Sequence, residues 1–451
     1  MRTLLFLAAQ VTIVVFGLPA AFHPAFRGAP LPARLAAAFG TGAVALAFEA
    51  TLLSTLGLRW NVVTLGLPLL AASLGISAWW SRRPYRSERN PAAPPAVIAV
   101  AATVMGLALV HLVLTLATAR ATSADFVLFW GVKGARFAAA GGIDAELLGS
   151  AFSHHLVPDY PPLVPIVLAW STLVAGELPW QVAPAASAIW MIAAIPLVLV
   201  FLRRRVPAAD SVAVAAFWTV ALAISMVHSA SGGNAEAPLL FFETTAVAAL
   251  LAETPTEPVA SRFLGAAALS GAAMTKVEGC VAVALIVAGV ALRDLRWRRP
   301  RVLRGVIRLA GAPLLCLAVW FVYQAVHGLK IGYRTHGDLV GLHLTAALSG
   351  MARHLQAGTA WLSWLIPLGL LAACARRVRV DSAPALSLVV GLLAFFLFDY
   401  LHDPTDPSTR IGWTLPRISQ PGLSALILAA GLASASRVSN SLHAGAVERR
   451  G

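Results

Sequence analysis

The sequence predicts an all-α, polytopic membrane protein with about 12–13 transmembrane helices, and this prediction depends on composition and on the lengths of the apolar runs. Of the 451 residues, 59% are hydrophobic and only 12% are charged, and the mean hydropathy is +0.78. Soluble domains are nearer half apolar and a quarter charged. The composition therefore excludes a soluble enzyme, a disordered chain and a small disulfide-stabilised scaffold.

The apolar runs are close to the roughly 20 residues that a helix needs to cross a hydrocarbon core about 30 Å thick. They fall at 3–20, 39–57, 61–80, 96–117, 182–202, 207–227, 237–252, 262–276, 278–292, 305–326, 356–375, 383–401 and 420–436. Only helices and closed barrels satisfy every backbone polar group in lipid, and the runs lack the ~10-residue alternation of barrel strands. Each run is therefore predicted to be a helix. We expect the first to be retained rather than cleaved as a signal peptide, because no small-x-small site follows it.

The surplus of basic residues is explained by membrane topology. The chain has 34 basic and 20 acidic residues, and only three of the basic ones are lysines. The arginines gather in short loops at 81–90, 203–205, 293–304 and 376–379. Cytoplasmic loops are rich in arginine and lysine, so we place these clusters in the cytoplasm and expect no nucleic-acid partner. The loops that then face outside are 118–181, 228–236, 327–355 and 402–419.

The long outer loop is predicted to contain two interfacial helices, at about 125–140 and 161–176. The second is apolar but short, and such segments are more often re-entrant or interfacial than spanning. If it spanned the membrane, the arginines at 203–205 would face outside. In the first helix, the helical spacing places Asp125, Phe129, Lys133 and Arg136 on one face and Phe126, Trp130 and Phe137 on the apolar side.

Several ionisable residues lie within or beside apolar runs, where they are costly unless the side chain faces the bundle interior or water. They are Glu49, Glu236, Glu243, Lys276, Glu278 and Asp399. Lys276 and Glu278 are close enough along the chain to neutralise each other, which is the structural alternative to a functional role. His154 and His155 are too few to indicate a metal site, and the three cysteines lack the spacing of metal ligands. No metal site is predicted.

Four polar residues of the outer loops have both a structural and a functional interpretation. Asp125 is either the N-cap of its helix or a general base at the membrane surface. Asp159 is either a helix cap before a proline-initiated helix or part of a site. Arg410 and Arg417 stand where arginine is otherwise scarce. They suit a phosphate, which guanidinium binds bidentately, or they contact lipid headgroups and the loop's own aspartates.

Taken in order, these motifs resemble those of the GT-C superfamily of membrane glycosyltransferases. The nearest branch is the family 39 type, which includes protein O-mannosyltransferases and aminoarabinose transferases. The resemblance covers roughly 96–421. It is carried by Asp125 with Trp130 and Lys133, by Pro158-Asp159-Tyr160-Pro161-Pro162-Leu163, by Glu236-Ala237-Pro238-Leu239, by Thr275-Lys276-Val277-Glu278-Gly279, and by the tail Trp413…Arg417…Gln420-Pro421. Two residues depart from the pattern. Phe126 stands where many members carry a second acid, and Glu236 stands where related bacterial sequences often show Asp.

The resemblance implies a fold and an activity. It implies a GT-C-like catalytic membrane module at 96–436, three extra N-terminal transmembrane helices at 1–95 and a short cytoplasmic tail at 437–451. It implies transfer of a hexose or pentose from a polyprenyl-phosphate-linked donor to an acceptor hydroxyl, with inversion, on the periplasmic face of the cell inner membrane. The acceptor class is a glycan, a lipid or a protein. No cofactor is implied besides this donor substrate, and a divalent metal is left open.

The resemblance also implies roles for individual residues. Asp125 is expected to be the general base. The donor phosphate is expected to be bound by Lys133, Arg136, Lys276, Arg410 and Arg417. Substrate orientation is expected from His155, Asp159, Tyr160, Glu236 and Glu278. The alternative function is a polytopic transporter or lipid flippase, which also carries intramembrane acids and interrupted helices; the amphipathic outer loop and the lack of a visible internal repeat favour the enzyme.

Overall fold

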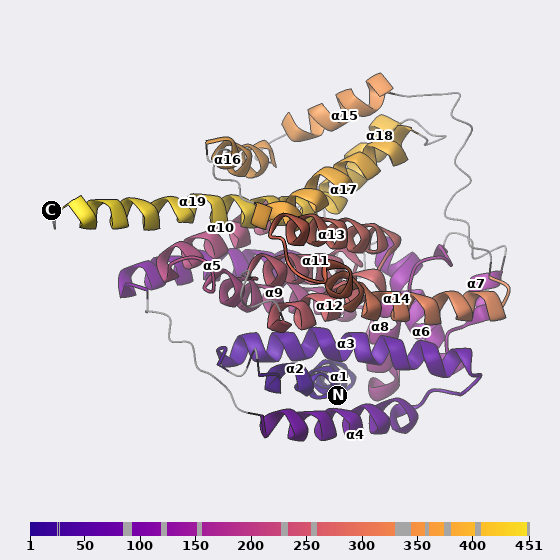
Figure 1. Ribbon diagram of the computed structural model, residues 1–451. Helices are drawn as coiled ribbons and strands as arrows, with labels where there is room; N and C mark the ends of the chain where they lie inside the picture. Colours follow the sequence, from indigo (N-terminus) through magenta and orange to yellow (C-terminus); the bar gives the residue numbers. More distant parts are fainter. Residues whose placement is uncertain are drawn as a thin grey trace.

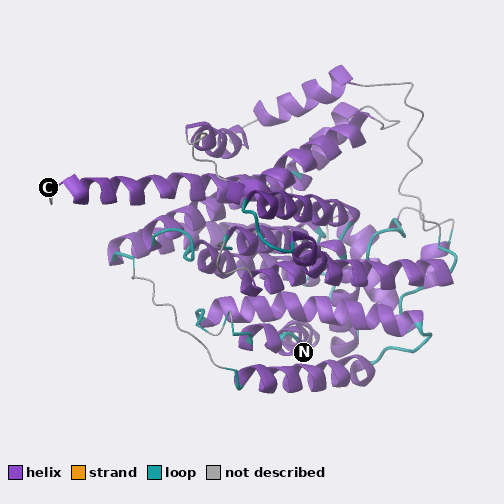
Figure 2. Ribbon diagram, viewed as in Figure 1, coloured by secondary structure: helices purple, strands orange, loops and turns teal. Residues whose placement is uncertain are grey.

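The structure is a computed structural model that describes most of the chain. The described residues are 1–24, 26, 28–83, 93–118, 124–150, 156–226, 233–253, 259–329, 344–356, 360–373, 380–401 and 407–448. In this part of the chain every regular element is a helix and no strand occurs (Figure 2). The predicted all-α class is thereby confirmed.

The helices follow one another with short connections through the described ranges. In the first half they are α1 (Arg2–Phe16), α2 (Leu18–Phe22), α3 (Leu31–Thr55), α4 (Val62–Ser81), α5 (Pro95–Thr118), the π-helix η2 (Phe126–Trp130), α6 (Gly131–Ala140), α7 (Ala145–Gly149), α8 (Leu163–Ala175), the 3₁₀ helix η4 (Ala183–Ala186), α9 (Ser187–Leu202) and α10 (Ala208–Met226). In the second half they are α11 (Glu236–Leu251), α12 (Val259–Ala273), α13 (Val277–Arg296), α14 (Val302–Val326), α15 (Leu344–Gln356), α16 (Ala360–Ala373), η7 (Val380–Ser382), α17 (Ala383–Leu401), α18 (Pro407–Ile418) and α19 (Gln420–Glu448).

Five of the described helical stretches are long and apolar enough to cross a membrane. They are α3, α4, η4 with α9, α14 and α17. Shorter apolar stretches of 10–17 residues lie in α1, α5, α8, α10, α16 and α19. These helices agree with an all-α membrane protein. The long and shorter stretches together number eleven in the described part of the chain, so the predicted total of about 12–13 spans would require all of them and one or two further helices to cross.

The N-terminal helices belong to the same packed core as the rest of the chain. Helix α1 packs against α3 and α8, and α3 also packs against α9, α12 and α14. Phe6 and Phe39 from these first helices share one buried cluster with Phe241 of α11 and Ile286 of α13. In Figure 1, α3 and α4 lie on one side of the body, and α15 and α18 lie on the opposite side. The helices before residue 95 therefore help to build the core that positions the later ones.

Helix α8 is an interior helix, which corrects the prediction of an interfacial helix at 161–176. Almost all of its side chains are buried, and it packs against α1, α3 and α6. Its polar side chains are satisfied by α1, since Gln10 Nε2 donates to Ser171 Oγ (2.6 Å) and Trp170 Nε1 donates to Thr12 Oγ1 (2.9 Å). A helix that is apolar all round has no face to present to water, so it is covered on every side.

A tight turn at Met274–Lys276 joins α12 to α13. A Cβ atom on Gly279 would lie 1.9 Å from the carbonyl oxygen of Ala272. Only glycine permits this close approach of the two backbones. The turn places Lys276 at the N-cap of α13 and Glu278 in its first turn, next to the start of α11, with which both helices are in contact.

Two of the predicted outer loops and the predicted tail contain helices that the sequence analysis does not anticipate. The loop 402–419 contains α18, the loop 327–355 contains α15, and the tail 437–451 continues as helix α19 to Glu448. In α18, Ile411 and Leu415 lie one turn apart and are buried. The helix packs this apolar face against α15 and α17, and an amphipathic helix of this kind is stabilised by its packing more than by its intrinsic propensity.

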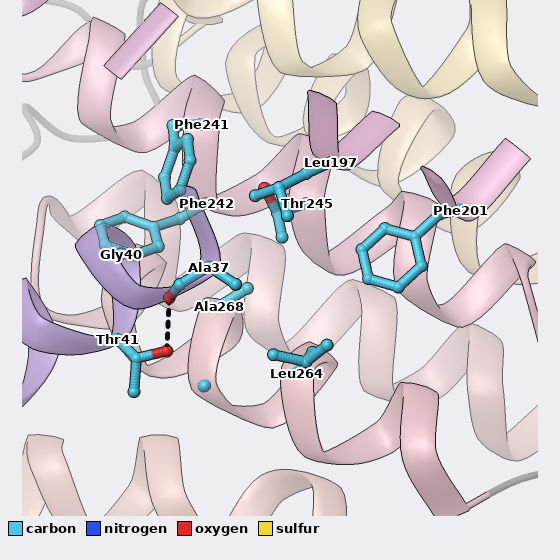
Figure 3. Close-up of a pocket in the computed structure, with 11 residues that line it drawn as sticks. Ala37, Gly40, Thr41, Leu197, Phe201, Phe241, Phe242, Thr245, Leu264 and Ala268 are labelled. Atoms are coloured by element: carbon cyan, nitrogen blue, oxygen red, sulfur yellow. Dashed lines mark hydrogen bonds between the residues drawn. The ribbon is translucent and has the colours of Figure 1, made fainter. Parts of the chain in front are cut away.

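The middle of the bundle is apolar. A small cavity of about 20 Å³ lies between α3, α9, α11 and α12. Figure 3 shows its lining of apolar side chains with the hydroxyl-bearing Thr41 and Thr245. Thr41 Oγ1 satisfies its hydrogen bond within its own helix by donating to the Ala37 carbonyl at 2.8 Å. The lining of this cavity contains no ionisable residue. The charged groups that could concern function lie toward the ends of the same helices.

Candidate functional site

A chain of ion pairs joins the starts of α11 and α13 to the end of α18. Glu236 is the first residue of α11 and Arg417 lies in the last turn of α18. Oε1 of Glu236 contacts both Arg417 Nη2, at 3.0 Å, and Lys276 Nζ, at 3.3 Å. Lys276 Nζ is also 3.3 Å from Oε1 of Glu278. The contact between Lys276 and Glu278 is therefore real, but the two residues are part of a larger network rather than an isolated pair.

Asp125 is the exposed member of this network. Its Oδ2 is 2.8 Å from Arg417 Nη1 and accepts a hydrogen bond from Asn234 Nδ2 at 3.3 Å. The Asp125 side chain is 41% exposed, whereas those of Glu236 and Lys276 are 7% and 6% exposed. We call Asp125, Glu236, Lys276, Glu278 and Arg417 the acid–base cluster; it joins four segments that are far apart in the sequence.

The structure decides against the helix-cap interpretation of both outer-loop aspartates. Asp125 precedes the π-helix η2, but its side chain makes no capping hydrogen bond. Helix α8 begins after Pro162 and also has no side-chain cap. Both contacts of the Asp125 carboxylate fall on Oδ2, so Oδ1 has no hydrogen-bond partner within the described residues. This oxygen is open to a ligand.

Lys133 points into the protein, which corrects its predicted place on a polar helix face. Its side chain is buried, and Nζ donates to the Val157 carbonyl at 3.0 Å while lying 4.3 Å from the centre of the Phe129 ring. Burial lowers the pKa of Lys133 to about 7, against an opposing effect of Asp159. The predicted apolar face is confirmed, since Phe126, Trp130 and Phe137 are buried. Lys133 thus holds the 156–160 segment rather than facing solvent.

The Pro158–Leu163 motif bridges this lysine and the acid–base cluster. Tyr160 stacks on Trp130, with ring centres 5.8 Å apart and planes 13° apart, and the Lys276 ammonium lies 5.5 Å from the centre of the Tyr160 ring. The backbone N–H of Leu163 donates to the Met274 carbonyl at 2.8 Å. Asp159 is buried next to it. The motif therefore fixes the turn that carries Lys276, and it supplies one aromatic wall near the cluster.

Two of the predicted site residues, Arg136 and Arg410, form ion pairs outside the cluster. Arg136 forms an ion pair with Asp144 at 2.8 Å, and Arg410 forms one with Asp399 at 2.7 Å. Each arginine is thus neutralised by an acid close to it in the sequence. His155 and the aspartates of the 402–406 segment lie outside the described residues.

Glu243 is a buried acid that the sequence singled out without assigning it a role. It lies about two turns along α11 from Glu236, and neither of its carboxylate oxygens has a hydrogen-bond partner. With the buried part of the cluster it lines a small cavity of about 10 Å³, together with Leu392 and Phe396. Glu236 Oε2 and Glu278 Oε2 are also buried without a hydrogen-bond partner among the described residues. The cavity therefore combines two cations with several unsatisfied hydrogen-bond acceptors.

The electrostatics of the site are set by these few groups. Arg417 keeps its charge, because Glu236 and then Asp125 raise its pKa against the effect of burial. Four carboxyl groups, counting Glu243, share only Lys276 and Arg417 as cations. Such a site can orient hydroxyl donors on its free oxygens and can attract an anion to its cations. Among the described residues, no three His, Cys, Asp or Glu side chains are arranged to hold a metal ion.

A second ionic network, which the sequence analysis missed, lies where α11 ends, α12 begins and α13 ends. The Glu253 carboxylate accepts a hydrogen bond from Arg293 and lies 2.9 Å from Arg262 Nε. Asp294 is contacted by Arg262 and by Arg299, and Arg299 Nη1 lies 3.1 Å from Asp294 Oδ1. Glu253 and Arg293 are completely buried. The 293–304 cluster was interpreted as topology alone. The signal that could have found the network is the presence of Glu253 and Asp294 among so many arginines.

Helix polarity places the two ionic networks at opposite ends of the bundle. The acid–base cluster is at the start of α11 and α13, and the Glu253–Arg293 network is at their other ends. In comparisons with known proteins, no family model, no curated protein and no solved structure matches this chain.

Proposed function

We propose that the protein is a polytopic membrane glycosyltransferase that transfers a sugar from a polyprenyl-phosphate donor to an acceptor hydroxyl at the outer membrane face. The single observation that supports this proposal is the contact chain from Asp125 through Arg417 and Glu236 to Lys276. A base, two cations and an orienting acid from separate segments lie together, which is the set of groups that such a reaction needs.

In the proposed reaction, Asp125 acts as the base. Its free Oδ1 accepts the proton of the acceptor hydroxyl as that oxygen bonds to the anomeric carbon of the sugar. The bond from this carbon to the phosphate oxygen breaks, and its electron pair leaves with the lipid phosphate. Attack from the side opposite the phosphate inverts the configuration. One carboxylate is sufficient because the phosphate departs as a stable anion and needs no proton.

The departing phosphate is assigned to Lys276 and Arg417. Both cations face the cavity and already share Oε1 of Glu236, so a phosphate would compete with Glu236 for them. Charge-assisted hydrogen bonds of this type stabilise an oxyanion strongly in a water-poor site. Lys133, Arg136 and Arg410 are not assigned to phosphate, because none of them is among the residues that line this cavity.

The unsatisfied acceptors of the cavity are assigned to the sugar. Hydroxyl groups are donors, and the free oxygens of Glu236, Glu243 and Glu278 are buried acceptors without partners. Filling them removes the desolvation cost that each unpaired oxygen carries. The apolar side chains of Leu392 and Phe396 line the same small cavity, which has room for about one water. The proposal therefore requires the site to widen before a sugar ring can contact Leu392 and Phe396.

The shorter apolar helices are taken to cross the inner membrane together with the five long ones.

One observation favours the alternative of a transporter. Glu243 is buried on a helix of the bundle with no partner for either oxygen, and isolated intramembrane acids are common in proton-coupled transport. Such a protein would move a solute without consuming a sugar donor. The two functions therefore differ in whether a covalent product forms.

The test is an assay of the purified protein with radiolabelled polyprenyl-phosphate sugars and a membrane extract as the acceptor source. The variant Asp125→Asn keeps the size of the side chain but cannot accept the proton. Asp144→Asn is the matched control, because Asp144 lies in the same outer region but pairs only with Arg136 and the α7 N-terminus. We expect transfer by the wild type and the control, and loss of at least ~100-fold in Asp125→Asn. Equal transfer by both variants would contradict the assignment of the base.

A further inference from the structure

A wide groove lies beside the Glu253–Arg293 network, between α3, α12 and α14. Its volume is about 710 Å³, far larger than that of the cavity at the acid–base cluster. Its wall is apolar and is formed by side chains such as Val44, Phe48, Phe263 and Leu315. Figure 1 shows α3, α12 and α14 close together in the lower half of the body, and the contacts between the three helices confirm it.

One end of the groove is strongly basic. Five arginines and one aspartate line it, and the aspartate, Asp294, is already paired with Arg262 and Arg299. The other three arginines, Arg301, Arg304 and Arg308, are exposed. None of these three makes an ion pair or a side-chain hydrogen bond within the described part of the chain. They are a surplus of positive charge that nothing in the described structure neutralises.

All three of these arginines line the groove at the start of α14. Arg301 is the N-cap residue of α14 and has a backbone φ of +61°. This left-handed conformation is uncommon for residues other than glycine and asparagine. Arg304 and Arg308 follow one turn apart on the same face. The start of α14 adds the positive end of its helix dipole. Three cations that repel one another and a helix N-terminus thus lie at the basic end of the groove, which favours the binding of an anion there.

The dimensions of the groove match one leaflet of a bilayer. From Arg301 at the mouth to Cys316 at the inner end, α14 rises about 22 Å at 1.5 Å per residue. Half of a bilayer, including the headgroup region, is about 20–22 Å thick. A charged end and an apolar trough of this length are complementary to an amphiphile whose headgroup carries a phosphate.

We infer that this groove binds an anionic phospholipid of the membrane leaflet opposite the acid–base cluster. Its phosphate is held by Arg301, Arg304 and Arg308, and its acyl chains lie along Phe48, Phe263 and Leu315. Basic pockets between transmembrane helices are known to hold anionic headgroups on the cytoplasmic side. The lipid would also cover the mouth beside the buried Glu253–Arg293 network. This inference does not depend on the proposed glycosyl transfer.

The test uses the full-length protein purified in detergent and incubated with an equimolar mixture of phosphatidylglycerol and phosphatidylcholine of identical acyl chains. Native mass spectrometry then counts the bound lipids. We expect one retained phosphatidylglycerol in the wild type and about a hundredfold weaker binding in the triple variant Arg301→Gln/Arg304→Gln/Arg308→Gln. The charge-matched control is Arg59→Gln/Arg296→Gln/Arg353→Gln, which removes three exposed arginines outside the groove, and it should retain the lipid.

A second variant separates groove binding from attraction at the surface. Ala312 lines the groove and is exposed, so Ala312→Trp fills the trough while leaving every arginine in place. We expect it to lose the lipid as well. The inference is overturned if the triple variant binds as the control does, if Ala312→Trp retains full binding, or if inorganic phosphate alone displaces the lipid. Retention of phosphatidylcholine as firmly as phosphatidylglycerol would overturn it too.

Discussion

Arg417 Nη1 lies 2.8 Å from Asp125 Oδ2, while the other terminal nitrogen of the same guanidinium lies 3.0 Å from Glu236 Oε1. One side chain therefore couples the exposed acid Asp125 to the buried acid Glu236 at the start of α11. The planar, forked guanidinium makes this possible, since its two terminal nitrogens reach two carboxylates in a fixed geometry. The position of the proposed base thus depends on a residue of α18.

Replacing Arg417 by lysine should impair this coupling. An ammonium is a point charge that cannot hold Asp125 and Glu236 in the same fixed geometry, so we expect at least ~10-fold lower kcat/KM for sugar transfer. Arg410→Lys is the control on the same helix, because Arg410 pairs with Asp399 outside the cluster. Steady-state kinetics with the labelled donor measure both. Similar rates in the two variants would contradict a special role for Arg417.

Lys133 should make stability depend on pH. Its folded pKa is about 7 against an unfolded value of 10.5, so between these values the unfolded chain binds more protons and stability rises with pH through this window. Below about pH 7 both states carry the charge, and this contribution is constant. In Lys133→Met, which keeps the apolar bulk, the rise in melting temperature between pH 7 and pH 10 should be smaller than in the wild type. An unchanged slope in thermal unfolding would contradict the buried position.

Glu243 and Glu278 should respond in opposite ways to the same substitution. Glu243 has no partner for either oxygen, so Glu243→Gln removes a buried carboxyl group and should raise the melting temperature by a few degrees. Glu278 contacts Lys276 at 3.3 Å. Glu278→Gln removes one of the negative charges that balance this lysine, so it should lower the melting temperature. Thermal unfolding of the two purified variants side by side measures the difference. A fall of the same size in both would show that Glu243 has an unrecognised partner.

Gly279 should be intolerant of a side chain. Its Cβ would meet the Ala272 carbonyl at 1.9 Å, so Gly279→Ala should force α12 and α13 apart and displace Lys276. We expect a destabilisation of several kcal/mol, in the range of severe overpacking, visible as lost folded yield. Gly311→Ala in α14 is the control, because a Cβ there meets nothing within 4 Å. A folded, active Gly279→Ala would show that the turn is more adaptable than its geometry indicates.

The sequence predicted most helices of the bundle but not all of them. The run at 383–401 has the bounds of α17 and the run at 305–326 lies within α14, because long apolar stretches can only be helices in lipid. Helix α18 was predicted as a loop, although Ile411 and Leu415 already show helical spacing. Its stability comes from packing on α15 and α17, which a single sequence does not reveal.

The site was predicted as a set of residues but not as a set of contacts. The resemblance supplied Asp125, Lys276 and Arg417, which lie in one network. It also supplied Arg136 and Arg410, whose partners Asp144 and Asp399 are close by in the sequence and neutralise them. An acid close to an arginine in the sequence therefore makes that arginine a weaker candidate for binding phosphate. Long-range pairs such as Arg417 with Asp125 depend on how the helices fold together, which spacing cannot give.

The central claim is that Asp125 performs chemistry while Lys276 and Arg417 hold the donor. The most direct test measures donor affinity and single-turnover transfer in parallel for the wild type, Asp125→Asn and Lys276→Met, with circular dichroism to confirm that each is folded. We predict that Asp125→Asn binds the polyprenyl-phosphate sugar within about threefold of the wild type but transfers it at least ~100-fold more slowly. Lys276→Met should bind the donor at least ~10-fold more weakly. Full transfer by Asp125→Asn, or undiminished donor binding by Lys276→Met, would contradict the account.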